Sequence, residues 1–389
     1  MIGKTNSRFD IKKADRSIDL STYDVYGNQV LHTTANCYIV KETGAYKLPL
    51  VFGNALKNGI QNSAAYTKNS GSYSHDFVDY KGNIINNPFI EIISGDAASA
   101  QLSITDTDGV FDNISIIDGE LCRYLKFEVK DIPATGANGI LSIKDSNGII
   151  MWNWHIWVWT ESLTTVQITN NTNVKYNIFP YCLASKWDNE NKTTLKHWFY
   201  QFGRPTPLLC PSAWNLSSNH SSFGVLSFNI QSGASSISQG ITNPTIFYKY
   251  TSNENWFSQN SSKTLNLWDA DCSSNGLSDN NVKKTIYDPS PIGFKMPNGN
   301  TFTGFKNIKS QNGHAYFTRY SGDNTGFPLP LSGARDYTSG SIIDSGVVDN
   351  VWTSASRNYN GVNISYSSSV IVTNHSSEAY GFAVLPVKE

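Results

Sequence analysis

The segment Ile149-Ile-Met-Trp-Asn-Trp-His-Ile-Trp-Val-Trp-Thr160 is the most apolar strand-forming stretch of this sequence. It directly follows Asn147-Gly148, a dipeptide typical of two-residue hairpin turns. Because successive side chains of a strand point to opposite faces, His155 would share its face with tryptophan side chains. A histidine in such surroundings is more often a hydrogen-bonded interior side chain than a ligand or a catalytic base. We therefore expect His155 in the core or in an interface.

Short runs of strand-forming residues also precede this stretch. Clusters that contain Gly, Asn, Asp and Pro separate these runs, and Asp108-Gly109 is a second dipeptide of the hairpin type. The runs are Cys37–Val40, Tyr46–Phe52, Phe89–Ile93, Gln101–Thr105, Tyr124–Val129 and Gly139–Lys144. This pattern predicts a mainly β fold with an N-terminal sandwich of antiparallel strands. No long segment has an apolar period of 3.6 residues, so we expect few and short helices.

The length of 389 residues indicates more than one domain. We expect a polar N-terminal tail at residues 1–20, a β-sandwich domain at 21–165 and a loop-rich domain at 166–389. No stretch approaches the ~20 apolar residues of a membrane-spanning helix, so we expect no membrane span. The polar start of the chain lacks the apolar region of a signal peptide. Either the chain is not secreted by that route or it begins as a mature protein, and we favour the second reading.

The composition favours an extracellular protein over a cytosolic enzyme. Lys and Arg number 30 and Asp and Glu number 31, so there is no positive charge excess to hold a nucleic acid. Charged residues make up only 16% of the chain, whereas 47 Ser and 41 Asn supply most of the polar surface. Aromatic residues reach 13%, which excludes a disordered chain.

The cysteines do not indicate a metal site. Their number, five, is odd, and no Cys-x-x-Cys pair or Cys/His spacing of the zinc type occurs. We expect most of them to be buried, reduced thiols that pack as small apolar side chains. They are Cys37, Cys122, Cys182, Cys210 and Cys272.

A series of motifs, in order along the chain, resembles the fimbrillin family of pilus proteins from gut anaerobes. Thr34–Val40 and Gly44–Ala55 resemble its opening motif, and Ile150–Val158 looks like the strand that closes that module. The later motifs of the series are Trp198–Pro205, Leu265–Trp268, Lys284–Pro297, Leu331–Arg335, Val351–Ser354 and Gly381–Val387. Each match alone is weak, and the signal comes from the whole series in order.

The resemblance implies an extracellular pilus tip adhesin. Its C-terminal domain would be an α+β domain similar to the C-type lectin-like fold and to the fold of the formylglycine-generating enzyme. The closing residues Gly381–Val387 would form a final strand that pairs near the beginning of that domain. Some lectin-like tips of this kind are diversified by retroelements, which change Asn codons to codons for Ser, Tyr, Thr, Ile, Asp or His.

No catalytic or metal-binding motif stands out. The chain contains no G-x-S-x-G, no H-E-x-x-H and no P-loop, although a Ser/His/Asp set from distant segments stays open. Closely spaced aspartates, as in calcium-binding loops, occur at Asp106, Asp108 and Asp112. The later Glu of an EF-hand is missing. A polar turn is the more common reading of such a cluster. We expect no cofactor and no catalytic residue.

The segment from Asn358 to Tyr380 is rich in the residues that build binding surfaces. Tyr supplies contact area at low entropic cost, and Ser and Asn supply adaptable hydrogen bonds. Val362, Ile364, Val370 and Val372 would anchor the segment as strands. We predict a variable, outward-facing ligand surface within Trp352–Tyr380. Its candidate ligand-binding residues are Trp352, Asn358, Tyr359, Asn360, Asn363, Tyr366, Ser368, Asn374, His375 and Tyr380.

These observations predict a non-enzymatic adhesin on the cell surface. Its partners would be a host or bacterial surface protein or glycan, together with other pilus subunits. A phage tail-fibre protein with the same lectin-like domain is the main alternative, and a structural pilus subunit is another. An enzyme of glycan metabolism would need two carboxylates in one cleft.

Overall fold

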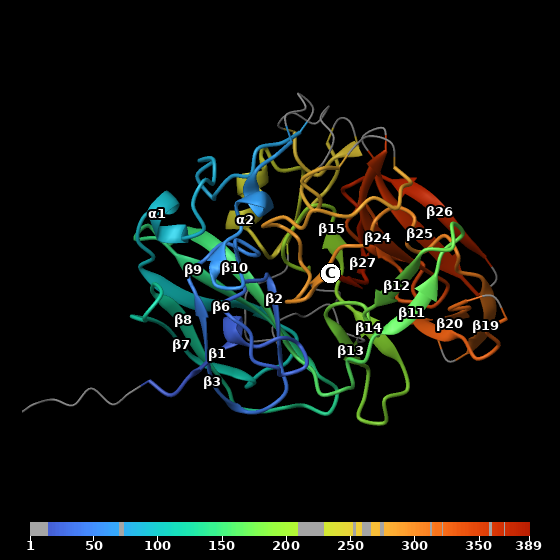
Figure 1. Cartoon of the computed structure of the whole chain (residues 1–389), viewed down its shortest axis with the longest axis horizontal. Coiled ribbons are helices and arrows are strands. Elements are labelled where there is room, and N and C mark those ends of the chain that lie inside the picture. Colours follow the sequence, from blue (N-terminus) through green and yellow to red (C-terminus); the bar gives the residue numbers. More distant parts are fainter. Residues whose placement is uncertain are drawn as a thin grey trace, which may run out of the picture.

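The strands of residues 18–158 form two four-stranded sheets, on the left of Figure 1. This computed structural model describes residues 15–69, 74–208, 229–251, 254–258, 266–272, 276–311, 313–320, 322–357, 360–368 and 370–389. The first sheet has the order β1 (Ile18–Asp19), β3 (Gly44–Pro49), β8 (Tyr124–Val129) and β7 (Phe111–Ile117). The second has the order β2 (Cys37–Val40), β10 (Ile150–Val158), β9 (Ala137–Lys144) and β6 (Ser99–Thr105).

The apolar stretch quoted above forms β10, a central strand of the second sheet. It pairs with β9 on one side, with Trp154 opposite Leu141, and with β2 on the other, with His155 opposite Cys37. Every side chain from Met151 to Trp159 is buried, because this strand is covered on both faces. Its hydrophobic run therefore reads as a buried strand rather than as a half-exposed one.

Two of the pairings differ from the expected all-antiparallel sandwich, because β1 pairs with β3 and β2 pairs with β10 in parallel. More than a hundred residues separate β2 from β10 along the chain, so no tight turn constrains their direction. Asp108-Gly109 also acts differently from the prediction. The turn carries the chain from β6 in one sheet to β7 in the other instead of closing a hairpin.

The two sheets contact one another through small and large side chains. Gly139 of β9 lies against the ring of Phe111 on β7, and a Cβ atom at residue 139 would come within 2.5 Å of that ring. Short elements complete this part of the chain. They are η1 (Leu20–Thr22), β4 (Leu56–Lys57), β5 (Ile60–Gln61), η2 (Ser63–Tyr66) and α1 (Ile90–Ser94).

A larger sheet organises the C-terminal residues, on the right of Figure 1. Its order is β23 (Ile342–Ile343), β22 (Ala334–Arg335), β27 (Gly381–Val384), β24 (Val348–Arg357), β25 (Asn360–Ser367) and β26 (Ile371–Ser376), with β15 (Tyr200–Gln201) paired to β27. The strand β26 is an edge strand because its one partner in the sheet is β25.

Smaller sheets surround this one, and the end of the chain returns to its second half. The last strand, β28 (Val387–Lys388), pairs with β12 (Lys175–Ile178) near the start of that half and with β18 (Phe294–Lys295) farther along it. The closing residues Gly381–Val387, expected as one strand, are divided between β27 and β28 in two different sheets. The remaining elements are β11 (Val166–Thr169), β12 (Lys175–Ile178), β13 (Ser185–Trp187), β14 (Leu195–His197), β16 (Asn229–Gln231), α2 (Ile237–Thr242), β17 (Ile246–Tyr248), β18 (Phe294–Lys295), β19 (Asn307–Gln311), β20 (His314–Phe317) and β21 (Phe327–Pro330).

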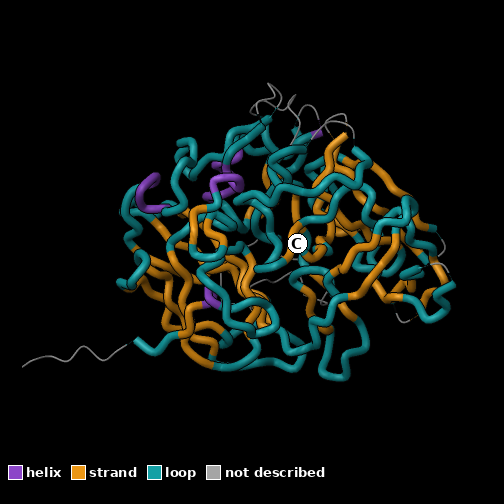
Figure 2. The backbone as a smooth tube through the Cα atoms, in the orientation of Figure 1, coloured by secondary structure: helices purple, strands orange, loops and turns teal. Residues whose placement is uncertain are grey.

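The prediction of a mainly β fold with short helices is confirmed. Strands hold 41% of the residues and helices 6%, and Figure 2 shows the helices as a few short turns among strands and loops. None of the helices in the described ranges has the length and apolar character that crossing a membrane requires.

Buried side-chain amides join the N-terminal sheets to the second half of the chain. Asn36 donates to the carbonyl oxygens of Ile286 and Asp288 at 2.7 and 2.9 Å. Asn54 donates to those of Thr285 and Asp288 at 2.6 and 3.1 Å. Aromatic residues from both sides belong to one core cluster, so the predicted boundary near residue 166 does not separate two hydrophobic cores.

Candidate ligand-binding surface

The predicted ligand segment forms β24, β25, β26 and the turn that leads into β27. Trp352 on β24 is fully buried, and its indole nitrogen donates to the carbonyl oxygen of Tyr200 at 2.9 Å. Asn363 and Tyr366 on β25 are also buried, at 0% and 1% exposure. The prediction that these two side chains face outward is therefore wrong. The reason is that β25 lies between β24 and β26 and has buried side chains on both faces.

Both buried residues of β25 have structural partners. The hydroxyl of Tyr366 donates to the carbonyl oxygen of Pro330 at 2.9 Å, and its ring packs edge-on against Phe317. Burial raises the pKa of this phenol well above its usual value. The amide of Asn363 donates to the side-chain oxygen of Asn350 at 3.1 Å. These contacts assign both residues to the scaffold.

Other predicted residues do lie at the surface. Ser368, Asn374 and His375 are exposed, whereas Asn360 and Tyr380 are half-buried. Asn358 and Tyr359 fall outside the described residues. Of the four apolar residues expected to anchor the segment as strands, Val362 and Ile364 are buried on β25, whereas Val370 and Val372 are 53% and 47% exposed. Val372 lies on the edge strand β26, and Val370 immediately precedes it.

Tyr380 belongs to a cluster of three tyrosines that come from distant parts of the chain. Tyr250 follows β17, Tyr337 follows β22, and Tyr380 precedes β27. The ring centroids of Tyr250 and Tyr337 are 5.3 Å apart, and those of Tyr337 and Tyr380 are 4.6 Å apart. Tyr250 is 46% exposed, and the other two are half-buried. We call Tyr250, Tyr337 and Tyr380 the tyrosine patch.

The tyrosine patch packs against buried aromatic residues of the core. Tyr380 stacks on Phe382 at 5.0 Å, and Phe382 packs against Trp352 at 4.4 Å. The backbone N–H of Tyr250 donates to the carbonyl oxygen of Tyr337 at 2.9 Å, which ties two of the three residues together. Trp352 was predicted as a ligand contact, and the structure places it under the surface as a support for it.

Three carboxylates lie in electrostatic range of the tyrosine patch. Burial is the main reason why the pKa of Tyr380 is raised to about 12, and Asp336, Tyr337, Glu254 and Asp344 add to the rise. Partial burial would raise the pKa of Asp336, but hydrogen bonds from Thr338 and Ser339 outweigh it and lower that pKa. At neutral pH the protonated phenol of Tyr380 therefore lies in range of the ionised carboxylate of Asp336.

Tyr250 and Tyr337 were not among the predicted site residues. Tyr250 lies in a Ser- and Asn-rich part of the sequence, and Tyr337 follows Arg335-Asp336 in a polar turn. Local patterns cannot join residues so far apart in sequence. The one usable signal was the polar turn Asp336-Tyr-Thr-Ser339, which resembles the composition of the predicted segment.

The described residues contain two Ser/His/Asp groupings. In the first, the Ser21 hydroxyl and the Asp19 carboxylate both approach the same nitrogen, Nδ1 of His32, at 2.9 and 3.6 Å, so the histidine does not relay between them.

The second grouping is formed by Ser332, His197 and Asp349. The hydroxyl of Ser332 lies 3.4 Å from Nδ1 of His197, and Nε2 of His197 lies 3.4 Å from Oδ2 of Asp349. All three side chains are completely buried, so they cannot contact a substrate from solution. This grouping is an interior polar network.

The three aspartates of the possible calcium loop do not converge. Oδ2 of Asp106 accepts hydrogen bonds from Asn138 and Trp198 at 2.8 and 3.0 Å. Asp112 forms an ion pair with Lys130. Within the ranges given above, no three His, Cys, Asp or Glu side chains are grouped so that they could hold a metal ion.

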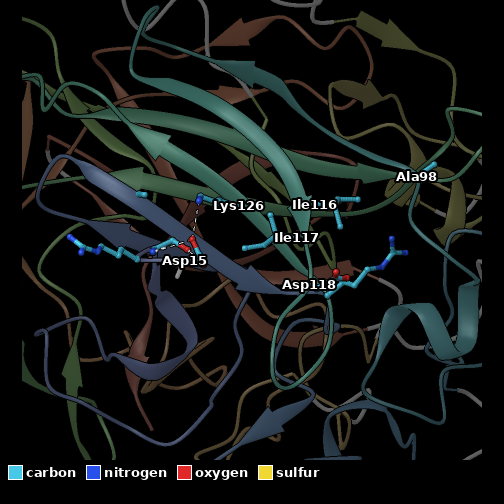
Figure 3. Close-up of a pocket in the computed structure, with 10 residues that line it drawn as sticks. Asp15, Ala98, Ile116, Ile117, Asp118 and Lys126 are labelled. Carbon is cyan, nitrogen blue, oxygen red and sulfur yellow. Dashed lines mark hydrogen bonds and ion pairs between the residues drawn. The ribbon is translucent and has the colours of Figure 1, made fainter. Parts of the chain in front are cut away.

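A hollow of about 850 Å³ lies on the first sheet, far along the chain from the tyrosine patch (Figure 3). Asp15, which lines this hollow, accepts hydrogen bonds from the ammonium groups of Lys47 and Lys126 at 3.2 and 2.9 Å. Burial opposes ionisation of Asp15, but hydrogen bonds from Ser17 and both lysines lower its pKa well below the usual value. The charges that line the hollow are thus partly paired with one another, and its lining includes no aromatic ring.

Comparison with known proteins identifies no relative. No family model, no curated protein and no solved structure matches this chain.

Proposed function

We propose that this chain is a non-enzymatic extracellular adhesin, located at the tip of a cell-surface pilus. It binds a protein or a glycan on another cell through its C-terminal half. In this proposal residues 21–165 form a β-sandwich spacer and residues 166–389 form a C-type lectin-like head. Other pilus subunits are its second class of partner.

The observation that carries the proposal is the tyrosine patch. Partly exposed aromatic residues at the surface of a folded chain are the usual anchors of protein and glycan ligands. The patch rests on buried Trp352 through Phe382, so binding would not require ordering of these side chains. Exposed polar residues of β26, among them Asn374 and His375, lie six and five residues before Tyr380 in the sequence and would supply an adaptable rim.

The position of the fimbrillin-like motifs also supports the proposal. Asn36 and Asn54 belong to the two N-terminal motifs, and they donate to carbonyl oxygens within Lys284–Pro297. Residues that carry the resemblance thus make the contacts between the two halves. Such contacts are expected if the motifs belong to one architecture.

The test is adhesion of the purified chain to whole epithelial and bacterial cells, together with a glycan array. We expect binding that falls at least about tenfold in Tyr250→Ala and in Tyr337→Ala, as for the loss of a binding anchor. Tyr320→Ala is the matched control, because Tyr320 is a 54% exposed tyrosine outside the patch. Equal adhesion of all four proteins would overturn the proposal, and so would turnover of a glycan.

Measurements on the same purified chain distinguish the alternative functions. A phage tail fibre would be a trimer by light scattering, whereas the adhesin is expected to be a monomer. A structural pilus subunit would polymerise but bind no cell. An enzyme of glycan metabolism would hydrolyse a member of the array.

Retroelement diversification is a separate part of the proposal. The variable positions would be the exposed residues of the segment, because changes at buried Asn363 and Tyr366 would disturb the scaffold. Sequencing of the gene's neighbourhood tests this part. A template repeat and a reverse transcriptase are expected there, and absence of both would refute it.

A further inference from the structure

We propose that the tyrosine patch selects a cationic group, the Lys or Arg side chain of a partner protein, over a neutral sugar. This inference rests on the proposed function, because it names the ligand class of the same surface.

The charge around the patch is negative. Asp336 directly precedes Tyr337, and the backbone oxygen of Glu254 accepts hydrogen bonds from Ser377 and Glu378, three and two residues before Tyr380. Asp344 follows β23, the strand that pairs with β22 next to Asp336. Within the described ranges, none of these three carboxylates forms an ion pair with a lysine or an arginine.

Two cations lie near these carboxylates in the sequence. Arg335 is only 3% exposed, and its guanidinium donates to the carbonyl oxygen of Gly340 at 2.6 Å and lies over the ring of Phe247. Lys249 directly precedes Tyr250. Neither pairs with Asp336, Glu254 or Asp344, so the carboxylates remain available to a cation from solution.

The carboxylate of Asp336 is held in one orientation. Its Oδ1 accepts hydrogen bonds from the backbone N–H groups of Thr338 and Ser339 at 3.0 and 2.7 Å. In the part of the chain that the structure describes, no hydrogen bond to Oδ2 is formed. A fixed carboxylate with one oxygen available is suited to accept from an ammonium or a guanidinium group.

The rings of the patch do not form one flat platform. The ring planes of Tyr337 and Tyr380 are inclined by 41°, and those of Tyr250 and Tyr337 by 56°. A sugar ring stacks best on a single flat aromatic face. Inclined neighbouring rings instead present several faces to a compact head group, and the negative face of a tyrosine ring attracts cations. Ring geometry and charge thus favour the same ligand.

The first experiment compares two peptide probes with the full chain. One is a peptide of alternating glycine and lysine, and the other is the same peptide with acetylated lysines. We expect the lysine peptide to bind more tightly and to lose affinity as salt is raised, because exposed charges are screened. Equal binding of both peptides would refute the cationic ligand.

Variants distinguish binding of the lysine peptide at the tyrosine patch from its attraction to negative charge elsewhere on the surface. Asp336→Asn with Glu254→Gln removes two charges at the patch, and Asp118→Asn with Glu120→Gln removes two exposed charges elsewhere. We expect about tenfold weaker binding of the lysine peptide by the first pair and less than about twofold by the second. Tyr337→Ala should weaken binding about fivefold, and Tyr337→Phe should retain it because the ring remains. An equal loss in the two charge pairs would refute the assignment to the patch.

The outcomes also separate this inference from the proposed function. If the chain adheres to cells and binds neutral glycans through Tyr250 and Tyr337, but not the lysine peptide, the adhesin proposal stands and the cationic ligand is wrong. If neither cells, glycans nor peptides bind in a patch-dependent way, both are wrong.

Discussion

At the scale of single residues, His155 shows how burial decides the role of a titratable group. Its side chain is completely buried, and Nε2 lies 2.9 Å from the side-chain oxygen of Asn138. Desolvation lowers its pKa to about 3, so the ring is neutral in the folded chain. This confirms the expectation of a core histidine with a hydrogen-bond partner, made from its tryptophan neighbours in the sequence.

The first prediction concerns acid sensitivity. The folded pKa of His155 lies below the unfolded value of 6.5, so protonation favours the unfolded state. The contribution of this residue is complete above pH 6.5 and is lost as the pH falls toward 3, by about 1.4 kcal/mol per pH unit. We expect His155→Gln to be less stable at neutral pH but to depend less on pH between 6 and 4. Denaturant unfolding measures both effects.

The exposed histidine His375 supplies the control. His375→Gln makes the same exchange of residue types at an exposed position and is compared with His155→Gln under the same conditions. If His155→Gln and the unaltered chain lose stability equally on acidification, His155 is not the group responsible.

A second prediction at the same scale concerns Asn36. Its amide donates to two buried carbonyl oxygens, and Asn36→Ala would leave that of Ile286 without this donor, whereas that of Asp288 keeps its hydrogen bond from Asn54. The expected loss of unfolding free energy is about 1–3 kcal/mol. Thermal and denaturant unfolding measure this loss. The exposed Asn171→Ala should change stability by less than about 0.5 kcal/mol, and an equal effect of both changes would contradict the role of Asn36.

At the scale of elements, the alternation of residues along a strand shows which side chains share a face. It does not show whether other elements bury that face. The sequence marks β10 as apolar throughout, and the strand is buried on both sides. The composition of the C-terminal segment placed Asn363 and Tyr366 of β25 at the surface, whereas both are buried. The strand β25 is rich in polar residues, yet it lies between β24 and β26 in its sheet. Its burial therefore depends on the elements around it and not on its own sequence of polar and apolar residues.

A third prediction concerns the contact between the two N-terminal sheets. In Gly139→Ala the new Cβ would come within 2.5 Å of the Phe111 ring, so the sheets would have to shift. We expect a loss of about 1–3 kcal/mol in unfolding free energy. The double variant Gly139→Ala with Phe111→Leu should recover part of it, which a double-mutant cycle measures. Strict additivity of the two changes would argue against direct contact.

At the scale of the whole molecule, the two halves share buried contacts. The ring of Tyr287 stacks on Trp152 at 6.0 Å, and the amide of Asn153 donates to the carbonyl oxygen of Ile241 at 2.8 Å. These side chains come from both sides of residue 166. The parts of the chain before and after the predicted boundary therefore pack against each other.

The fourth prediction follows from this packing. Because the halves bury aromatic side chains against one another, we expect the full chain to unfold in a single calorimetric transition. Residues 21–165 expressed alone would expose Trp152 and should aggregate or bind a hydrophobic dye. Two separate transitions, or a soluble and cooperatively folding fragment, would instead indicate independent domains.

Local patterns along the chain were enough to predict the mainly β class of fold, the short helices and the apolar strand Ile150–Val158. These features depend on local periodicity and turn residues, which a single segment carries. The burial of Trp352, Asn363 and Tyr366 and the meeting of Tyr250, Tyr337 and Tyr380 at the surface follow from the folded arrangement instead. Burial depends on which elements cover a strand, and contact between distant residues depends on chain topology. The sequence of a single segment therefore predicts neither the burial of its side chains nor their contacts with distant residues.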